Sequence, residues 1–107
     1  HAITAELPLN APRIIGSVRD QNDQQVSGVR ITQPNNTFTT TTDVNGKFEL
    51  PLSSGENVLH MTPGRFKSLD LSLALKPDST YYLDVILVAD IPKNRAQNSS
   101  AQWVEEP

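Results

Sequence analysis

The chain has no cysteine among its 107 residues. Disulfides, thiolate metal sites and cysteine nucleophiles are therefore excluded together, while the compartment stays open. Histidine is scarce as well, since only His1 and His60 occur. A Ser-His-Asp triad uses histidine as its base, but His1 lies in an expected tail and His60 in an expected strand. The sequence therefore predicts a protein that is not an enzyme, with no cofactor and no metal site.

Long apolar runs and a large excess of charge are also missing. Hydrophobic residues make up 36% of the chain, and no run approaches the roughly 20 residues needed to span a bilayer. The net charge is −3, which argues against a nucleic-acid surface or a polybasic membrane patch. The opening stretch HAITAELPLNAP lacks the basic start and apolar middle of a secretory signal, so we expect a mature product or an excised fragment. The length suits one domain.

Helical periodicity is absent, and apolar residues recur instead with the period of two that is typical of strands. The clearest alternation places Leu71 and Leu73 on one face of a strand, opposite Ser72. For 56–62 the pattern leaves the inward face open. Seven strands are predicted, about ten residues apart, at 13–20, 28–34, 37–43, 47–52, 56–62, 68–75 and 81–88. This spacing favours an all-β antiparallel sandwich or barrel.

Both ends of the chain depart from this pattern. Residues 1–11 are expected to be an N-terminal tail or linker, and residues 89–107 a polar, aperiodic C-terminal tail or linker. The sandwich domain would then occupy residues 12–88. Trp103 is an exception, as a large apolar residue in a polar stretch. It either folds back onto the sandwich or belongs to an interface with a partner.

The stretch Asp43-Val44-Asn45-Gly46 predicts a turn. Asn and Gly tolerate the positive φ angles of tight turns, and Asp43 can accept hydrogen bonds from backbone N–H groups. A calcium loop is the alternative, but it needs a bidentate Glu at its twelfth position. That position is Ser54, so we expect a structural turn and no metal.

The order of these motifs resembles the carboxypeptidase regulatory-like domain. The opening strand of that family, G-x-V-x-D, is matched by Gly16 to Asp20, and its next strand by Gly28-Val29-Arg30-Ile31. Its T-D-x-x-G-x-F-x-L segment is matched by Thr42, Asp43, Gly46, Phe48 and Leu50. The usual Gly-aromatic pair is split here as Gly64-Arg65-Phe66.

The resemblance covers about residues 13–88 and implies a transthyretin-like (prealbumin-like) fold, a seven-stranded Greek-key β-sandwich. It implies a non-catalytic accessory module that occurs beside metallopeptidase domains, before TonB-dependent outer-membrane receptors, or in surface-anchored proteins. A hydrolase branch of the fold uses clustered histidines and a C-terminal Tyr-Arg-Gly-Ser signature. This chain has neither.

Three places are candidates for partner contacts. Thr39, Thr40 and Thr41 lie in a strand that could accept an added strand if it is an edge, and Thr40→Pro would then block pairing. Arg65 and Phe66 belong to a small basic-aromatic turn, and Trp103 is the third candidate. The alternative for the threonines is a solvated strand, and for Arg65 and Phe66 a solvated turn.

The aromatic residues also suggest a carbohydrate-binding site. The alternative is that they pack in the core or at the rim of the sandwich. Tyr81 and Tyr82 point to opposite faces, so at most one of them is exposed. The full set is Phe38, Phe48, Phe66, Tyr81, Tyr82 and Trp103.

The prediction is a structural or protein-interaction module of a periplasmic, cell-surface or secreted protein. It would dock through an edge strand or end loops onto a protein partner or neighbouring domains. The first alternative is a carbohydrate-binding module with a glycan partner. The weaker alternative is a small hydrolase using His60 and Asp43.

Overall fold

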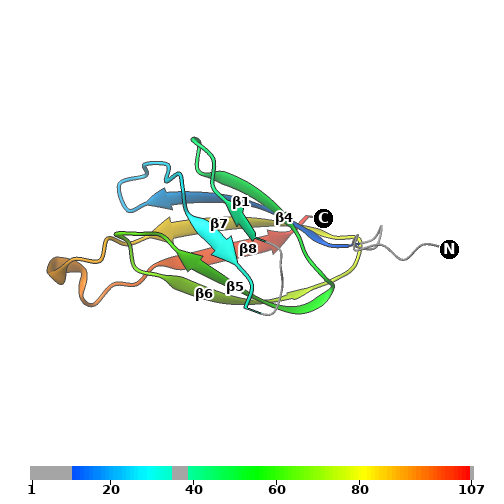
Figure 1. The fold of residues 1–107 in the computed structure, drawn as a ribbon. Coiled ribbons are helices and arrows are strands. Elements are labelled where there is room, and N and C mark those ends of the chain that lie inside the picture. Colours follow the sequence, from blue (N-terminus) through cyan, green and yellow to red (C-terminus); the bar gives the residue numbers. More distant parts are fainter. Residues whose placement is uncertain (1–10, 35–38, 107) are drawn as a thin grey trace.

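Two four-stranded sheets pack face to face in the computed structural model, which describes residues 11–34 and 39–106 (Figure 1). Sheet A has the strand order β4-β1-β7-β8, and sheet B has the order β3-β2-β5-β6. The strands are β1 (Arg13–Asp20), β2 (Arg30–Thr32), β3 (Thr39–Thr41), β4 (Lys47–Pro51), β5 (Gly55–Thr62), β6 (Leu69–Leu75), β7 (Thr80–Leu87) and β8 (Ser100–Glu105). His1, Phe38 and the expected tail up to residue 10 lie outside the described residues.

The predicted all-β sandwich is confirmed, with two differences in its strands. Each of the seven expected segments forms a strand, although β2 and β3 are only three residues long. The first difference concerns the antiparallel arrangement, which holds for every other strand pair of the two sheets but not for β1 and β7, which run parallel in the middle of sheet A. A hairpin cannot join parallel strands, and here the chain visits sheet B between them.

The second difference is an eighth strand inside the segment that was expected to be a polar tail. Residues 89–107 contain a short 3-10 turn, Pro92–Asn94, followed by β8, which pairs with β7 over its whole length. Most side chains of β8 are exposed, and Ala101 alone within it is partly buried. Because neither face of β8 is well buried, its sequence lacks a clear period-two pattern, which is why the sequence did not predict it.

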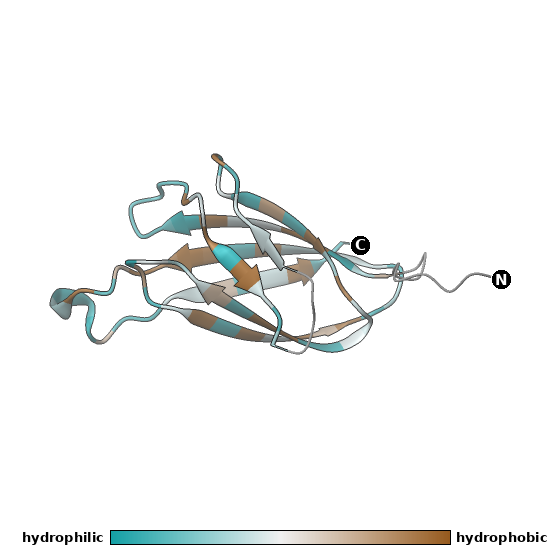
Figure 2. Ribbon diagram, viewed as in Figure 1, coloured by the Kyte–Doolittle hydropathy of each residue, from teal (hydrophilic) through white to brown (hydrophobic). Residues whose placement is uncertain are grey.

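The core lies between the sheets and follows the predicted alternation. Figure 2 shows hydrophobic and hydrophilic residues alternating along the strands. In β5 the face that the sequence left open is settled, since Leu59 and Met61 are buried and Val58 is exposed. The cluster of buried residues is Ile14, Val18, Val29, Ile31, Phe48, Leu50, Leu52, Leu59, Met61, Leu71, Leu73, Leu75, Tyr81, Leu83, Val85 and Leu87.

The segment Asp43–Gly46 forms the expected turn. Asp43 Oδ1 accepts hydrogen bonds from the backbone N–H groups of Asn45 (2.8 Å) and Lys47 (2.9 Å). Gly46 has a φ of 72°, and its carbonyl accepts a hydrogen bond from Val18 N–H at 2.8 Å. The carboxylate of Asp43 is thus used to shape the turn, and the turn is held against β1.

The two ends of the described chain lie at the same end of the sandwich. Arg13 N–H donates to Ser79 O, and Glu106 N–H donates to Thr80 O. The loops at 21–29 and 88–99 lie at the opposite end (Figure 1). The sandwich therefore presents a loop end that lies opposite the first and last described residues, Ala11 and Glu106.

Candidate functional site

Strand β8 is an edge of sheet A, and the direction of its backbone groups follows from its register. Glu106 N–H donates to Thr80 O at 2.7 Å, and Gln102 and Val104 are the next residues of β8 in phase with Glu106. Antiparallel partners alternate between hydrogen-bonded and non-bonded pairs, so the backbone groups of Gln102 and Val104 point toward β7. Those of Ala101, Trp103 and Glu105 point away from the sheet. Edge groups of this kind are a template for another strand.

Trp103 lies beside this row of outward backbone groups. It pairs in register with Leu83, which is buried in the core, so its side chain is on the inner face of sheet A. The residue is nevertheless 41% exposed, because β8 is the last strand of the sheet. Of the two interpretations of Trp103, folding onto the sandwich is therefore correct, and part of its surface remains available for contact.

The threonine strand β3 is also an edge, which the sequence analysis had left as a condition, but it offers fewer outward backbone groups than β8. It pairs with β2 over three residues and adjoins β4, the edge of the other sheet on the same side. Thr42 N–H donates to Val29 O, so the alternation of the ladder directs the N–H of Thr40 toward β2. Thr40→Pro would consequently break the β2–β3 ladder, and only Thr39 and Thr41 present outward N–H groups.

The turn with Arg65 and Phe66 is mainly a structural feature. Phe66 is partly buried against the core, and the guanidinium carbon of Arg65 lies 5.5 Å from the centre of its ring. Lys67 Nζ donates to the carbonyls of Asn94 (2.6 Å) and Gln97, which ties this turn to the 88–99 loop. In the basic-aromatic cluster expected from the sequence, Phe66 therefore packs against the core and Lys67 supports the 88–99 loop. Of these three residues, Arg65 alone is exposed.

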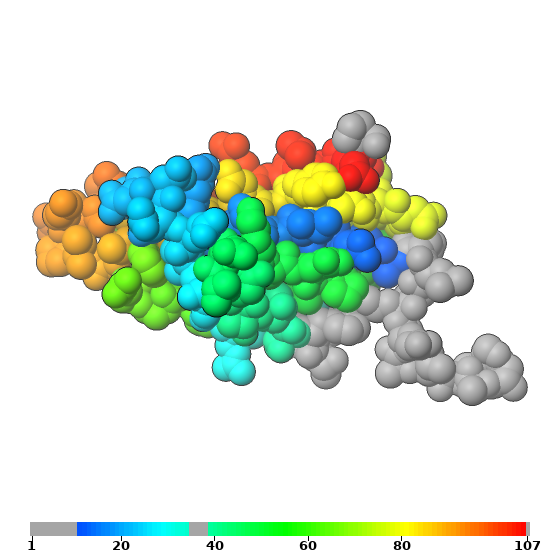
Figure 3. Space-filling model, turned by 90° about the horizontal axis from the view of Figure 1, so that it is seen from above, coloured from blue at the N-terminus to red at the C-terminus, as the bar shows by residue number. Residues whose placement is uncertain are grey.

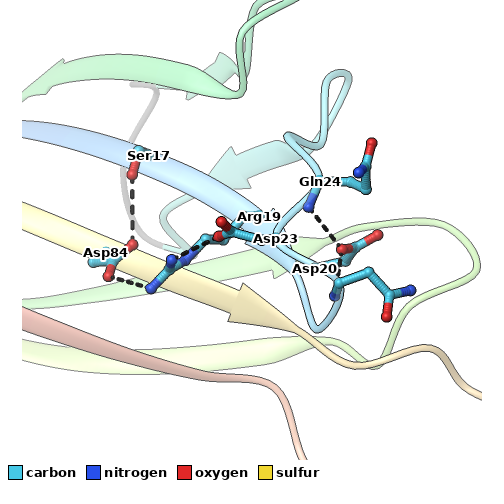
Figure 4. Close-up of polar contacts among 7 residues, drawn as sticks. Ser17, Arg19, Asp20, Asp23, Gln24 and Asp84 are labelled. Carbon is cyan, nitrogen blue, oxygen red and sulfur yellow. Dashed lines mark hydrogen bonds and ion pairs between the residues drawn. The ribbon is translucent and has the colours of Figure 1, made fainter.

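The outer face of sheet A carries a polar network that the sequence did not predict (Figure 4). Arg19 forms ion pairs with Asp23 (2.8 Å) and Asp84 (3.1 Å), and Ser17 Oγ donates to Asp84 at 3.5 Å. The hydrogen bond to Asp23 and the charge of Asp84 raise the pKa of Arg19 above its ordinary value. In the adjacent turn, Asp20 Oδ1 accepts two backbone N–H groups.

Next to this network lies an open groove, whose lining includes the aromatic residues Tyr82 and Trp103. Tyr82 is 42% exposed, whereas Tyr81 is buried, as the alternation of β7 predicts for one of the two. The hydroxyl of Tyr82 donates to Glu106, and this hydrogen bond, together with the negative charge of the carboxylate, raises the pKa of Tyr82. The sequence signal for Tyr82 was the alternation of β7, which places Tyr82 with Asp84 on the face opposite Tyr81 and Leu83.

The predicted contact residues are not brought together in one site. Thr39–Thr41 and Trp103 lie on edge strands of different sheets, and Arg65 and Phe66 lie in the loop between β5 and β6. His60 contacts Asp70 on the outer face of sheet B, away from Asp43. Within the described residues, no three His, Asp or Glu side chains gather as metal ligands would, and no helix is long and apolar enough to cross a membrane.

A family model for the carboxypeptidase regulatory-like domain matches residues 13–88, which is more than half of the chain. The chain belongs to this family. The regulatory-like domain is a β-sandwich and a non-catalytic module, so the fold and the non-catalytic class agree with the sequence analysis. A search of curated proteins finds no match to the chain.

The residues that carry the regulatory-like motif have structural roles here. Gly16 lies opposite the Phe48 ring, and Val18 is in the core. Asp20 and Asp43 shape turns, and Gly46 packs on β1. The matched residues 13–88 cover β1 to β7, whereas β8 lies outside them. The family motif therefore accounts for the framework, and the β8 edge is a feature of this chain beyond the matched region.

Proposed function

We propose that this regulatory-like domain is a non-catalytic protein-interaction module of a secreted or cell-envelope protein, and that it docks by accepting an extended segment at the β8 edge. The partner is another protein or a neighbouring domain. The observation that carries this proposal is the row of outward backbone groups at Ala101, Trp103 and Glu105, beside a half-exposed Trp103 side chain. The location is an expectation drawn from the resemblance to modules of secreted and envelope proteins.

Comparison with the other edges favours β8. Strand β4 contains Lys47 and Pro51, two residue types that discourage pairing at an edge. Strand β3 is only three residues long. Strand β6 is longer, but its leucines are turned into the core and it has no exposed aromatic residue. β8 combines six residues without lysine or proline with an exposed tryptophan, a residue type that is enriched at interface hot spots.

Glu105→Pro is expected to weaken docking while leaving the sandwich folded. Proline removes the outward N–H of residue 105 and places its ring where a partner carbonyl would approach, whereas the N–H groups that bind β7 remain. Loss of one hydrogen bond contributes about 0.5–1.5 kcal/mol, so we expect affinity to fall by about threefold to tenfold, or more if the ring excludes the strand. The measurement is photo-crosslinking from a reactive residue at position 103, in intact cells that produce the full native protein.

Glu105→Ala is the matched control. It removes the same contacts to Lys76 and Ser79 as the proline variant but keeps the backbone N–H. Crosslinking should persist in Glu105→Ala and decline in Glu105→Pro. Equal crosslinking in both variants, with both folded by circular dichroism, would show that strand addition at β8 is not the docking mode.

A further inference from the structure

The outer face of sheet A contains a hollow of about 300 Å³ between β4 and β8. In Figure 3 the chain segments of this sheet lie side by side, from green β4 through blue β1 and yellow β7 to red β8. We call this hollow the sheet A groove, and its volume is at the lower end of the range for small-ligand sites. Its lining also includes Gly16, Leu83 and Trp103, and the lining residues whose side chains lie on the outer face of the sheet are Ile15, Ser17, Lys47, Tyr82, Asp84, Gln102 and Val104.

Strand register sorts these side chains into two neighbouring rows across the sheet. The first row is apolar and joins Ile15, Tyr82 and Val104. Tyr82 and Val104 are 42% and 63% exposed, so this row is open to solvent. Exposed apolar side chains that lie next to one another often mark a binding surface.

The second row is polar and lies two residues further along the same strands. It joins Lys47, Ser17, Asp84 and Gln102. The row offers donors from lysine and amide groups and acceptors from carboxylate and amide oxygens. Lys47 forms no ion pair with a carboxylate in the described part of the chain, so its ammonium is available to a ligand.

The polar row continues into a second hollow, of about 430 Å³. The two hollows share Ser17, Lys47 and Asp84, and the second extends toward Arg19 and Asn45. One open channel thus runs along the sheet, apolar at the Tyr82 end and polar at the other. An extended polar ligand of more than one unit fits such a shape.

We propose that the sheet A groove binds a glycan, with one sugar ring against Tyr82 and its hydroxyl groups on the polar row. A pyranose ring has one face of C–H groups, which pack on an aromatic side chain, and a rim of hydroxyls that both donate and accept hydrogen bonds. The apolar row with Tyr82 matches the C–H face of the sugar, and the adjacent polar row matches its hydroxyl groups. The polar row makes a purely apolar ligand a poor fit, because burial of the Lys47 ammonium without a partner would be costly. This inference does not depend on docking at β8.

The test is titration of the isotopically labelled protein with maltohexaose, chitotetraose and a soluble peptidoglycan disaccharide-peptide, followed by NMR. We expect at least one of these probes to shift the backbone amides of Lys47, Tyr82, Asp84 and Gln102, and not those of β6. Tyr82→Ala should lower the affinity at least tenfold, because it removes the aromatic side of the site. Tyr82→Phe should keep most of the binding, since the hydroxyl is directed to Glu106.

Val58→Ala is the matched control, because Val58 is 43% exposed on the outer face of the other sheet. It should leave binding unchanged. The proposal is overturned if none of the three probes moves the groove amides at millimolar concentration, or if Tyr82→Ala binds as well as the wild type. Glu105→Pro should bind the sugar normally, which separates failure of this inference from failure of β8 docking.

Discussion

Gly16→Ala is expected to destabilise the domain strongly, although it adds a single methyl group. A Cβ at this position would lie 2.2 Å from Cε1 and Cζ of Phe48, far inside van der Waals contact. Phe48 is only 5% exposed, so its ring has no free space into which to move. Overpacking of a core costs about 1–3 kcal/mol, and we expect the free energy of unfolding to fall by the upper part of this range. Urea denaturation followed by fluorescence gives the value.

Two further variants make this result interpretable. Ser17→Ala alters the next residue of β1 on the outer face, where we expect a change within about 0.5 kcal/mol. Phe48→Leu combined with Gly16→Ala should recover part of the loss, because the smaller side chain gives the new methyl room. A wild-type denaturation midpoint for Gly16→Ala would mean that the Phe48 ring does not cover Gly16.

Gly46→Ala is expected to lower the free energy of unfolding clearly more than Gly28→Ala, although both glycines have nearly the same φ angle. Their φ angles are 72° and 76°, in the left-handed region that costs a residue with a side chain about 1–2 kcal/mol. A Cβ on Gly46 would in addition lie 2.5 Å from the carbonyl oxygen of Val18, whereas a Cβ on Gly28 meets nothing within 4 Å. That oxygen is backbone and accepts a hydrogen bond from Val26 N–H, so it cannot move freely.

We therefore expect Gly46→Ala to lower the free energy of unfolding by about 1–3 kcal/mol more than Gly28→Ala does. Both variants share the cost of the positive φ, so their difference isolates the collision with β1. Thermal and urea unfolding of the pair provide the measurement. Equal losses would contradict the close packing of the Asp43–Gly46 turn on β1.

The sequence predicted those parts of the fold in which one face of a strand is buried. Leu71 and Leu73 alternate with polar residues because they face the core. Asp43 and Gly46 predict a turn because the carboxylate accepts nearby backbone N–H groups and glycine tolerates a positive φ. Both kinds of signal lie within a few neighbouring residues. They could therefore be found without knowing which strands are partners.

The features that the sequence did not predict depend on strand order and register. Neither face of β8 is well buried, so the strand has no clear periodic pattern, and its status as an edge follows only from its pairing with β7. The sheet A groove gathers Ile15, Tyr82 and Gln102 from distant parts of the chain. The direction of the Thr40 N–H likewise requires the β2–β3 register. Each of these properties depends on which strands are neighbours, and no single segment of the sequence contains that information.

The central claim is that β8 is a strand of the sheet with one row of unpaired backbone groups, and amide hydrogen exchange measured by NMR tests it most directly. We predict slow exchange for Gln102 and Val104, whose N–H groups face β7, and fast exchange for Ala101, Trp103 and Glu105. Uniformly fast exchange from Ser100 to Glu105 would mean that β8 is not a stable strand. Slow exchange at Ala101 and Trp103 in the isolated domain would mean that the edge is already covered, and either result would contradict the account.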